Sequence, residues 1–331
     1  MNYFAYIESP LQAFNLMEYT GFANIEIDIL IINKKTLVSK KNYPQILSVI
    51  KNIKIKKVID IDIESGKGNV LKIWKLVKLY VPRTDVPYTL ICGEYRSMIF
   101  WYICGRFLNR RVIMLDDGTA TLRINRKNRT IKSAFRNHIY RILGFIDVFL
   151  EPIVFFSVYD IHAVISGKDR LIAHKYDFFK KKMESFPTGD NVVYVIGSPF
   201  LEAGVVNDDD IKTTLGMIEK LKCKYPKVIY ISHRREREEK LLAINKHVLV
   251  ERLDYPFELL PLVLGKRIKA IAGFYSSLFD NMHIICGDDL DIECFYLPQA
   301  SINPSWSAFV SDVYKNYLAY PGQAFKFHSL V

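Results

Sequence analysis

Short apolar runs alternate with longer stretches of helical periodicity along the first half of the chain. Runs of about five β-branched or aromatic residues predict buried strands, and apolar positions three or four residues apart predict helices between them. This alternation indicates a parallel sheet covered by helices on both faces. The predicted strands are Tyr3–Ile7, Ile27–Ile32, Lys57–Ile61, Tyr88–Cys92 and Arg111–Leu115, with helices that include Pro10–Tyr19 and Leu71–Tyr80.

The same alternation begins again in the second half, after the charged segment Lys180–Asn191, which contains a proline and a glycine and is the predicted linker. We therefore expect two α/β domains, residues 1–185 and 186–331, with the last helix either in the second domain or packed back on the first. The predicted strands are Val192–Ile196, Val228–Ser232, His247–Val250 and Ala270–Phe274, with helices at about Asp210–Lys222, Arg235–Asn245 and Pro256–Leu264.

Composition narrows the class of protein. A chain of 331 residues that is 50% hydrophobic suits two cores. The five cysteines are scattered and never form a C-x-x-C pair, so neither a zinc site nor a disulfide framework is predicted. The amino terminus lacks the pattern of a signal peptide, and the longest uncharged run, Cys294–Ser311, is interrupted by prolines. We expect no membrane-spanning helix and a cytoplasmic location.

The net charge of +11 is unevenly distributed. Residues Gly105–Arg141 hold ten Lys or Arg against Asp116 and Asp117. Such a stretch is suited to an anionic membrane surface, an acidic glycan or nucleic acid, and equally to a solvated surface. No zinc-finger or RNP-type pattern accompanies it, so we do not expect a nucleic-acid partner.

Polar residues follow most of the predicted strands. Ligands of open α/β sheets bind beyond the carboxyl ends of the strands, so these residues are the candidates for a site. They are Glu8 and Ser9, Glu94, Asp116 to Gly118, Gly197 to Pro199, His233 and Arg234, and Gly273 to Ser277.

The sequence Asp116-Asp117-Gly118 follows the predicted strand Arg111–Leu115. The glycine permits a turn with positive φ that holds the carboxylates at the strand tip, where one of them can act as a general base. An ordinary Asp-Gly turn with solvated carboxylates is the alternative interpretation.

His233 and the serine pair Ser276-Ser277 suit a phosphate. A histidine at a strand tip beside arginines can hydrogen-bond or protonate a departing phosphate oxygen. Serines at a helix start offer hydroxyls, backbone N–H groups and the positive end of the helix dipole. The alternatives are a surface histidine and a plain serine N-cap. The acidic pairs Asp60/Asp62 and Asp288/Asp289 are too common a pattern to predict a metal site.

In this order, the D-D-G, the His-Arg after a strand and the Tyr-Ser-Ser at a helix start resemble the D/E-D-G, H-P and S-S motifs of bacterial sialyltransferases. The resemblance is closest to glycosyltransferase family 52 and the polysialyltransferase-like proteins. It extends to the opening Glu8–Gln12 and to Pro256–Glu258, and so spans most of the chain. His233-Arg234 departs from the His-Pro of the family.

The resemblance implies the GT-B fold, in which two Rossmann-like domains face a central cleft. It also implies inverting, metal-independent transfer of sialic acid or a related nonulosonic acid from its CMP donor to lipopolysaccharide, lipooligosaccharide or capsule, with no cofactor. The resemblance implies that Asp117 is the base, supported by Asp116, that His233 acts at the leaving phosphate, which Ser276 and Ser277 hold, and that Glu258 binds the ribose. Further residues implied in donor binding are Tyr275, Pro256, Phe257 and Arg234, with Gly197, Ser198 and Pro199 bordering the nucleotide. Those implied toward the acceptor, in the amino-terminal half, are Glu8, Ser9, Gln12 and Glu94.

Three alternatives stay open. The donor can be another CMP-sugar, such as CMP-Kdo, or a UDP-sugar, and the chain can be a non-catalytic module that binds nucleotide or glycan. Oligomeric state is not predicted. The basic segment Arg123–Arg141 and the apolar stretch Ile142–Tyr159 suggest peripheral contact with the cytoplasmic membrane. Burial of Phe145, Phe149, Phe155 and Phe156 in a core is the competing explanation of that stretch.

Overall fold

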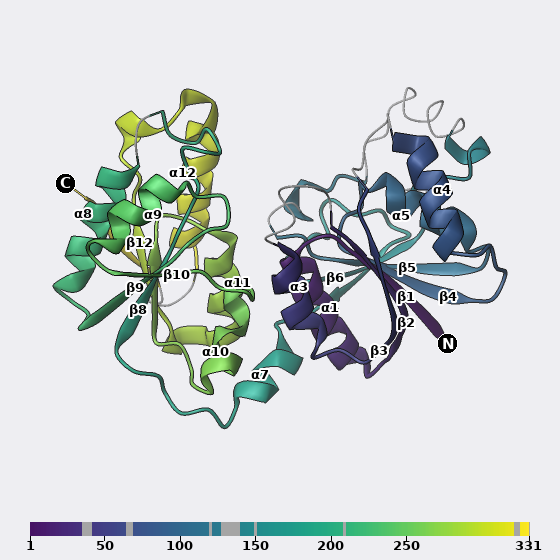
Figure 1. Ribbon diagram of the computed structural model, residues 1–331, viewed down its shortest axis with the longest axis horizontal. Helices are drawn as coiled ribbons and strands as arrows, with labels where there is room; N and C mark the ends of the chain where they lie inside the picture. Colours follow the sequence, from purple (N-terminus) through teal and green to yellow (C-terminus); the bar gives the residue numbers. More distant parts are fainter. Residues whose placement is uncertain are drawn as a thin grey trace. The chain divides into compact units, whose positions relative to one another are not determined.

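The computed structural model describes residues 1–34, 42–63, 69–118, 121–126, 140–148, 151–207, 210–320 and 325–330. The chain divides into two compact units, Met1–Phe178 and Phe179–Val331 (Figure 1). The division falls within helix α7, Asp177–Met183, in which Phe179 and Met183 are buried. The expectation that Lys180–Asn191 is wholly a linker is therefore wrong in its first four residues, which are helical.

The amino-terminal unit is a parallel seven-stranded sheet with the order β3-β2-β1-β4-β5-β6-β7. Helices α1 and α3 cover one face of this sheet, and α4 and α5 cover the other (Figure 1). The elements are β1 (Asn2–Ile7), α1 (Pro10–Ala23), β2 (Ile27–Asn33), α3 (Asn42–Ile50), β3 (Ile55–Ile61), α4 (Val70–Tyr80), β4 (Tyr88–Cys92), α5 (Met98–Arg106), β5 (Arg110–Leu115), the 3-10 turn η2 (Thr121–Arg123), β6 (Ile153–Ser157) and β7 (Arg170–Ala173).

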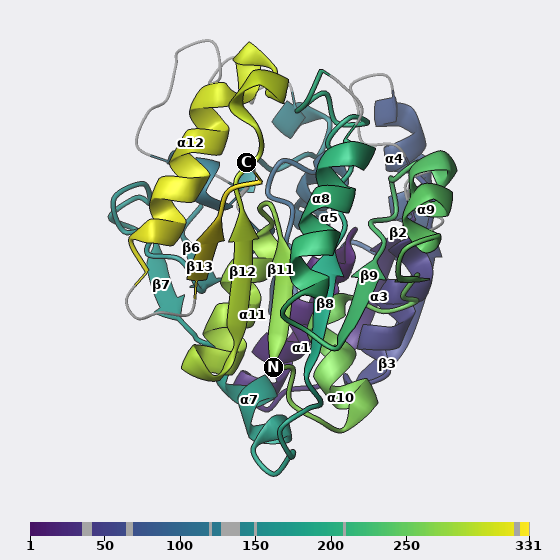
Figure 2. The ribbon, with the colours of Figure 1, turned by 90° about the vertical axis from the view of Figure 1, so that its left-hand side faces the viewer.

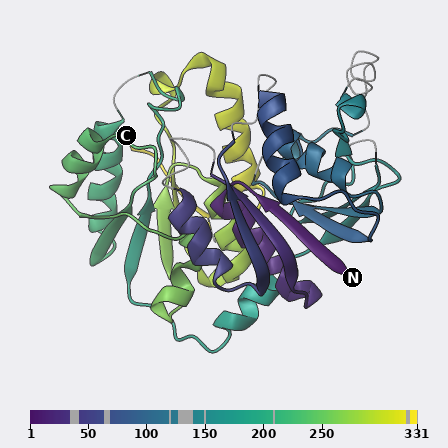
Figure 3. The same cartoon turned by 45° about the vertical axis from the view of Figure 1, so that its right-hand side comes forward.

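The core of this unit lies where the sheet meets α4 and α5. Phe4 and Tyr6 of β1 are fully buried there, together with Ile73 and Val77 of α4 and most of α5. Because both faces of the sheet are covered, its central strands read as continuous apolar runs. Figure 3 marks the amino terminus at the start of β1, the end of the strand opposite Glu8 and Ser9.

The carboxy-terminal unit is a parallel six-stranded sheet with the order β10-β9-β8-β11-β12-β13. Figure 2 shows α8 and α9 in front of this sheet and α10 and α11 behind it. The elements are β8 (Val192–Ile196), α8 (Ile211–Lys222), β9 (Lys227–Ile231), α9 (Glu238–Asn245), β10 (Leu249–Glu251), η4 (Phe257–Leu259), α10 (Leu260–Leu264), β11 (Ala270–Gly273), α11 (Ser277–Cys286), η5 (Gly287–Asp289), β12 (Asp291–Phe295), η6 (Gln299–Ser301), α12 (Pro304–Leu318) and β13 (Phe325–His328).

The structure confirms the predicted strand–helix alternation in both halves, including every predicted strand to within two residues at each end. It adds strands that the pattern did not single out, among them β6, which lies inside the apolar stretch Ile142–Tyr159. Phe145, Phe155 and Phe156 of that stretch are at most 1% exposed, so core burial explains them; Phe149 lies outside the described residues. Among the described helices, none combines the length and apolar character needed to cross a bilayer.

Candidate active site

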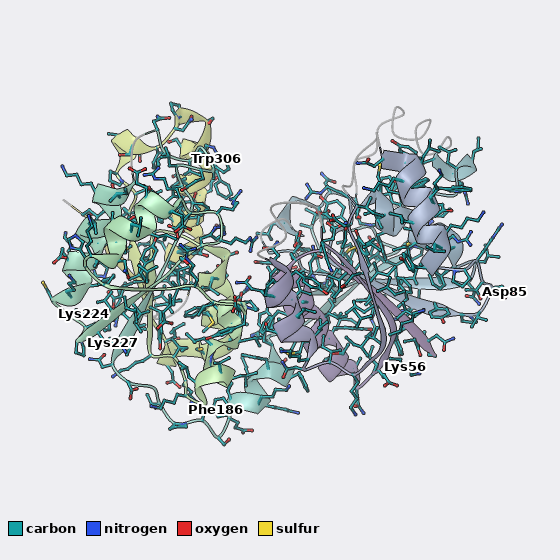
Figure 4. The ribbon with its side chains drawn as sticks, viewed as in Figure 1. Lys56, Asp85, Phe186, Lys224, Lys227 and Trp306 are labelled. Atoms are coloured by element: carbon teal, nitrogen blue, oxygen red, sulfur yellow. The ribbon has the colours of Figure 1, made fainter. Side chains whose placement is uncertain are left out.

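The strand orders of the two sheets define where each unit binds a ligand. Numbered by their own strands, the two sheets share the order 3-2-1-4-5-6, to which the first sheet adds a seventh strand. The strand order therefore reverses direction between β1 and β4 in one sheet and between β8 and β11 in the other. Ligands of such sheets bind at this switch point, beyond the carboxyl ends of the strands. Near the opposite ends, Lys56, in β3, pairs with Asp28, and Lys224, before β9, pairs with the buried Glu293; both lysines are labelled in Figure 4. The candidate residues therefore follow the strands at the edge where a ligand is expected.

Asp117 lies directly beyond β5, held in place by its turn. Gly118 adopts φ 62°, as the Asp-Gly pattern predicted. The backbone N–H of Asp117 donates to Thr121 Oγ1 at 3.0 Å, and Gln12 Nε2 donates to Asp117 Oδ1 at 3.0 Å. The side chain is only partly buried, so a fixed carboxylate faces solvent at the strand tip.

Gln12 of α1 orients this carboxylate. Its Oε1 accepts a hydrogen bond from the Glu8 N–H at 2.8 Å, which aims its Nε2 at Asp117. A Cβ on Gly93 would lie 2.3 Å from Gln12 Cγ, so only glycine leaves room for Gln12 beside the end of β4. Gln12 is 2% exposed and uses both ends of its amide within the protein. It therefore acts on Asp117 as a positioning residue, a contact that sequence reasoning did not predict.

Asp116 is buried beneath Asp117 and ties β5 to the end of β6. It is 2% exposed, and its Oδ1 accepts from Ser157 Oγ at 2.6 Å while its Oδ2 accepts from the Val158 N–H at 2.7 Å. Burial raises the pKa of Asp116 to about 7, against the opposing effect of these hydrogen bonds. The geometry gives Asp116 a supporting role, since both of its oxygens are engaged inside the protein.

His174 and Asn15 complete this buried network. His174 Nε2 lies 4.0 Å from Asp116 Oδ2, and its ring stacks on Phe156 with centroids 3.9 Å apart. Asn15 Nδ2 donates to the backbone oxygen of Asp116 at 2.9 Å. Neither residue was singled out from the sequence, because a lone histidine or asparagine carries no pattern.

The other predicted acceptor residues differ in exposure. Glu8 is 4% exposed and accepts from Ser97 Oγ at 3.0 Å, so its carboxylate is part of the protein interior. Ser9 is the N-cap of α1, with its Oγ accepting from the Gln12 N–H. Glu94 pairs with Arg96 at 3.1 Å. Ser9 and Glu94 are partly exposed, as contact with an acceptor requires.

His233 follows β9 in a turn that fixes its ring. Its backbone N–H donates to Glu236 Oε2 at 2.7 Å, and its Nδ1 accepts from the Arg235 N–H at 3.1 Å. Burial lowers the pKa of His233 to about 3, with Arg234 and Arg235 adding to the effect. Because Nδ1 is an acceptor, the neutral ring carries its proton on Nε2. The geometry suits a hydrogen-bond donor to an anion.

A buried ionic cluster, which the sequence did not suggest, supports His233. Lys240 of α9 is 1% exposed, and its Nζ lies 2.6 Å from Asp210 Oδ2, 2.8 Å from Glu236 Oε1 and 3.0 Å from the Ser198 oxygen. Tyr230 donates to the same Glu236 oxygen at 2.6 Å. Lys240 and Glu236 therefore join the loop after β8 to the loop after β9.

Gly197 lets these two loops pack together. A Cβ at this position would lie 2.3 Å from Glu236 Oε2 and 2.9 Å from the His233 nitrogen. Ser198 is partly exposed, and Pro199 is buried beside Phe200. The predicted segment Gly197 to Pro199 is thus in direct contact with the His233 turn, although the two are more than thirty residues apart.

The serine pair lies at the start of α11, as predicted. Ser276 is the N-cap, with its Oγ accepting from the Leu278 N–H at 3.2 Å, and Ser277 is the first helical residue. Tyr317 of α12 donates to the Ser276 oxygen at 2.7 Å and accepts from its N–H at 3.2 Å. Tyr275 packs against Phe200. A partly exposed helix start of this kind binds anions through its dipole and N–H groups.

Glu258 lies behind this helix start. Pro256 is the N-cap of η4, and the Phe257 ring packs on Tyr194. Glu258 is 7% exposed, its Oε1 accepts from Asn281 of α11 at 3.0 Å, and burial raises its pKa. Glu258 therefore links η4 to α11.

The acidic pairs that resemble metal ligands take part in ion pairs. Asp60 contacts Lys34 at 2.9 Å, and Asp289 contacts Arg267 at 3.4 Å. Within the described ranges, no three His, Cys, Asp or Glu residues gather as a metal site would require.

Comparisons with known proteins give the fold. No protein-family model matches the sequence, and no curated protein matches it. The structure is similar to an α/β-galactoside α-2,3-sialyltransferase from Photobacterium phosphoreum, with 12% identity over 98% of each chain and a TM-score of 0.55. It is also similar to UDP-GlcNAc 2-epimerase from Methanocaldococcus jannaschii, with 13% identity over 100% of this chain and 89% of that chain and a TM-score of 0.50.

These likenesses and the two parallel sheets show the GT-B fold, built from two Rossmann-like domains. Proteins with this fold include transferases and epimerases, so the fold does not by itself choose the reaction. The residues at the strand ends must do so.

Proposed function

We propose that the chain is an inverting glycosyltransferase that moves a sialic acid or a related nonulosonic acid from its CMP donor to a glycan. The observation that carries the proposal is the division of chemistry between strand ends: a fixed carboxylate follows β5, while a histidine and a serine-capped helix start follow β9 and β11. These residues are also the three motifs by which the sequence resembles bacterial sialyltransferases.

The amino-terminal unit supplies the base. In the proposed step the acceptor hydroxyl oxygen forms a bond to the anomeric carbon of the donor, and its proton passes to Asp117. The bond from that carbon to the phosphate oxygen breaks, and CMP leaves with the electron pair. Gln12 and Thr121 hold Asp117 in place, and Ser9 and Glu94 are the partly exposed candidates for acceptor contact. General base catalysis of this kind contributes about 10²–10⁴-fold.

The carboxy-terminal unit receives the charge of the leaving phosphate. The neutral His233 ring donates from Nε2, and Ser276, Ser277 and the α11 start add hydroxyls, N–H groups and the helix dipole. Preorganised donors of this kind stabilise developing negative charge without reorganising during the reaction. Tyr275, Arg234, Gly197 to Pro199 and Pro256 to Glu258 are the remaining groups assigned to the nucleotide. No metal ion or cofactor is needed in this scheme.

Thermal-shift measurements with CMP, UDP and GDP test the nucleotide first. We expect stabilisation by CMP, since bound ligand stabilises the folded state by mass action. Stabilisation by UDP alone would contradict the CMP donor and favour a UDP-sugar enzyme, such as a transferase or an epimerase.

A panel of CMP-activated sugars then tests the reaction. CMP release is measured with and without lipopolysaccharide, lipooligosaccharide or capsular glycan as acceptor. Release that depends on both a CMP-nonulosonic acid and a glycan supports the proposal. Tight CMP binding with no release from any donor and acceptor pair would instead define a non-catalytic nucleotide-binding module.

A further inference from the structure

Helix α4 exposes large apolar side chains that a solvated helix would not require. Leu71 is 75% exposed, Leu79 is 72% exposed and Trp74 is 40% exposed. The helix also buries Ile73 and Val77 in the core of the unit, so its inward face is already satisfied. Three large apolar residues are thus exposed within three turns of one helix, and clustered exposed apolar residues mark a site of interaction.

Lysines are interspersed with these apolar residues. Lys72, Lys75 and Lys78 are exposed, and no acidic residue occurs between Val70 and Tyr80. Lys78 Nζ lies over the Trp74 ring, 4.6 Å from its centroid. We call Leu71, Lys72, Trp74, Lys75, Lys78 and Leu79 the α4 face. A helix surface that combines leucine, tryptophan and lysine is typical of helices that lie in the interface of a bilayer.

A second exposed apolar segment belongs to the same side of the sheet. Ile142 is 75% exposed and Leu143 is 46% exposed, next to the exposed Arg141. Tyr140 anchors this segment, because its ring packs on Trp101 of α5, and α5 packs on α4. The α4 face and Ile142–Leu143 therefore lie on one helix layer.

We propose that the α4 face docks on an anionic lipid surface. The lysines match the charge of the headgroups, while Leu71, Trp74 and Leu79 enter the boundary between headgroups and acyl chains. This assignment differs from the one suggested by the sequence, in which the stretch Ile142–Tyr159 made the contact. Phe145, Phe155 and Phe156 of that stretch lie in the core and Tyr159 packs against it, while Ile142 and Leu143 are large apolar residues that remain exposed.

Charge favours lipid over a second copy of the chain as the occupant. In a two-fold symmetric dimer the same surface meets itself. The three lysines of one α4 face would then meet the three of another, with no acid on either helix to compensate. An anionic bilayer neutralises all three, each contributing about 1 kcal/mol near the surface.

Vesicle co-sedimentation tests the proposal on the full chain. We expect binding at low salt to vesicles that contain phosphatidylglycerol and not to phosphatidylcholine alone. Lys72→Gln/Lys75→Gln/Lys78→Gln should weaken it by about a hundredfold, from the lysine contributions combined. The matched control is Lys212→Gln/Lys220→Gln/Lys222→Gln on α8, which removes the same charge where no large apolar residue is exposed. Absence of binding, or equal weakening by the control, overturns the proposal.

Tryptophan fluorescence gives a second, local measurement. Trp74 is one of three tryptophans, and Trp101 is 8% exposed in the core. Phosphatidylglycerol vesicles should shift the emission of the wild-type protein to shorter wavelength, and Trp74→Phe should abolish most of the shift while vesicle binding persists. A shift that survives Trp74→Phe would overturn the proposal. So would a concentration-dependent dimer that Leu71→Ser/Leu79→Ser abolishes, because a second copy would then cover the face.

Discussion

The two Rossmann-like units share one strand order and differ in the chemistry at their strand ends. In the amino-terminal unit the end of β5 is acidic, with the partly buried Asp117 next to the buried Asp116. In the carboxy-terminal unit the ends of β9 and β11 carry His233 and the serines at the start of α11. Burial shifts the pKa values of the carboxyl and the imidazole in opposite directions. It raises the pKa of Asp116 to about 7 and lowers that of His233 to about 3.

In the proposed function this difference separates two tasks between units of similar architecture. The fold favours ligand binding at the strand ends of each unit, and the local residues suit one position to take up a proton and the other to stabilise an anion. In each unit a buried side chain holds a partly buried one: Gln12 orients Asp117, and Glu236 fixes the His233 turn.

The largest effect is expected at Asp117. Asp117→Asn keeps the hydrogen-bonding shape but removes the base, so transfer should fall by about 10²–10⁴-fold while CMP binding is unchanged. Steady-state CMP release and a CMP titration measure the two quantities. Asp85→Asn, at an exposed aspartate labelled in Figure 4, is the control and should retain both. Wild-type turnover by Asp117→Asn would show that Asp117 is not the general base.

Lys240→Met tests the buried cluster of the other unit. It leaves Glu236 buried without its lysine and Asp210 with only the more distant Arg237, at 3.7 Å, which should cost about 3–5 kcal/mol in the free energy of unfolding. Denaturant unfolding measures the loss. Lys212→Met, at an exposed lysine of α8, should change stability by less than about 0.5 kcal/mol. Equal losses in the two variants would contradict the role of the cluster.

The opposite pKa shifts predict opposite pH dependences. Asp116 titrates at about 4 in an unfolded chain, so between about pH 4 and 7 only the folded state holds its proton, and its contribution to stability falls as pH rises. His233 titrates at about 6.5 when unfolded, so between about pH 3 and 6.5 only the unfolded state holds its proton, and its contribution rises with pH.

Unfolding midpoints measured across this pH range for Asp116→Asn and His233→Asn check the signs. The stability difference between wild type and Asp116→Asn should shrink as pH rises, and that between wild type and His233→Asn should grow. Differences that do not vary with pH would refute the assignment.

The smallest effect is expected at the start of α11. Ser276→Ala removes the N-cap and should cost about 1 kcal/mol of stability. Asn303→Ala is a matched control, because Asn303 caps α12 in the same unit. Both variants should lose similar stability, but only Ser276→Ala should weaken CMP binding, as measured by titration calorimetry. Equal CMP affinity in the two variants would show that Ser276 caps α11 and does not bind CMP.

Much of the fold could be predicted because its strands are apolar runs bounded by turn residues. The ranges predicted for β4 and β8 match the observed strands at both ends. Strand β6 was missed because it lies within a longer aromatic stretch. Strand β13 was missed because it is only four residues long, and all four of its residues are partly buried.

The candidate site was predictable in its positions and less so in its contacts. Strand ends identified Asp117, His233 and Ser276, but no pattern shows that Gln12 reaches across 105 residues to Asp117. Lys240 was not singled out, since a lysine on a charged helix is ordinarily solvated, and only the tertiary structure places it among carboxylates. Such contacts depend on packing between distant segments.

The burial of Lys240 gives the carboxy-terminal unit an internal reporter. An acylating reagent that labels exposed amines within minutes will spare Lys240 as long as α9 stays docked on the loops after β8 and β9. The rate at which this one amine becomes labelled therefore measures local opening around Ser198 and His233, and a bound ligand that holds those loops together will slow it.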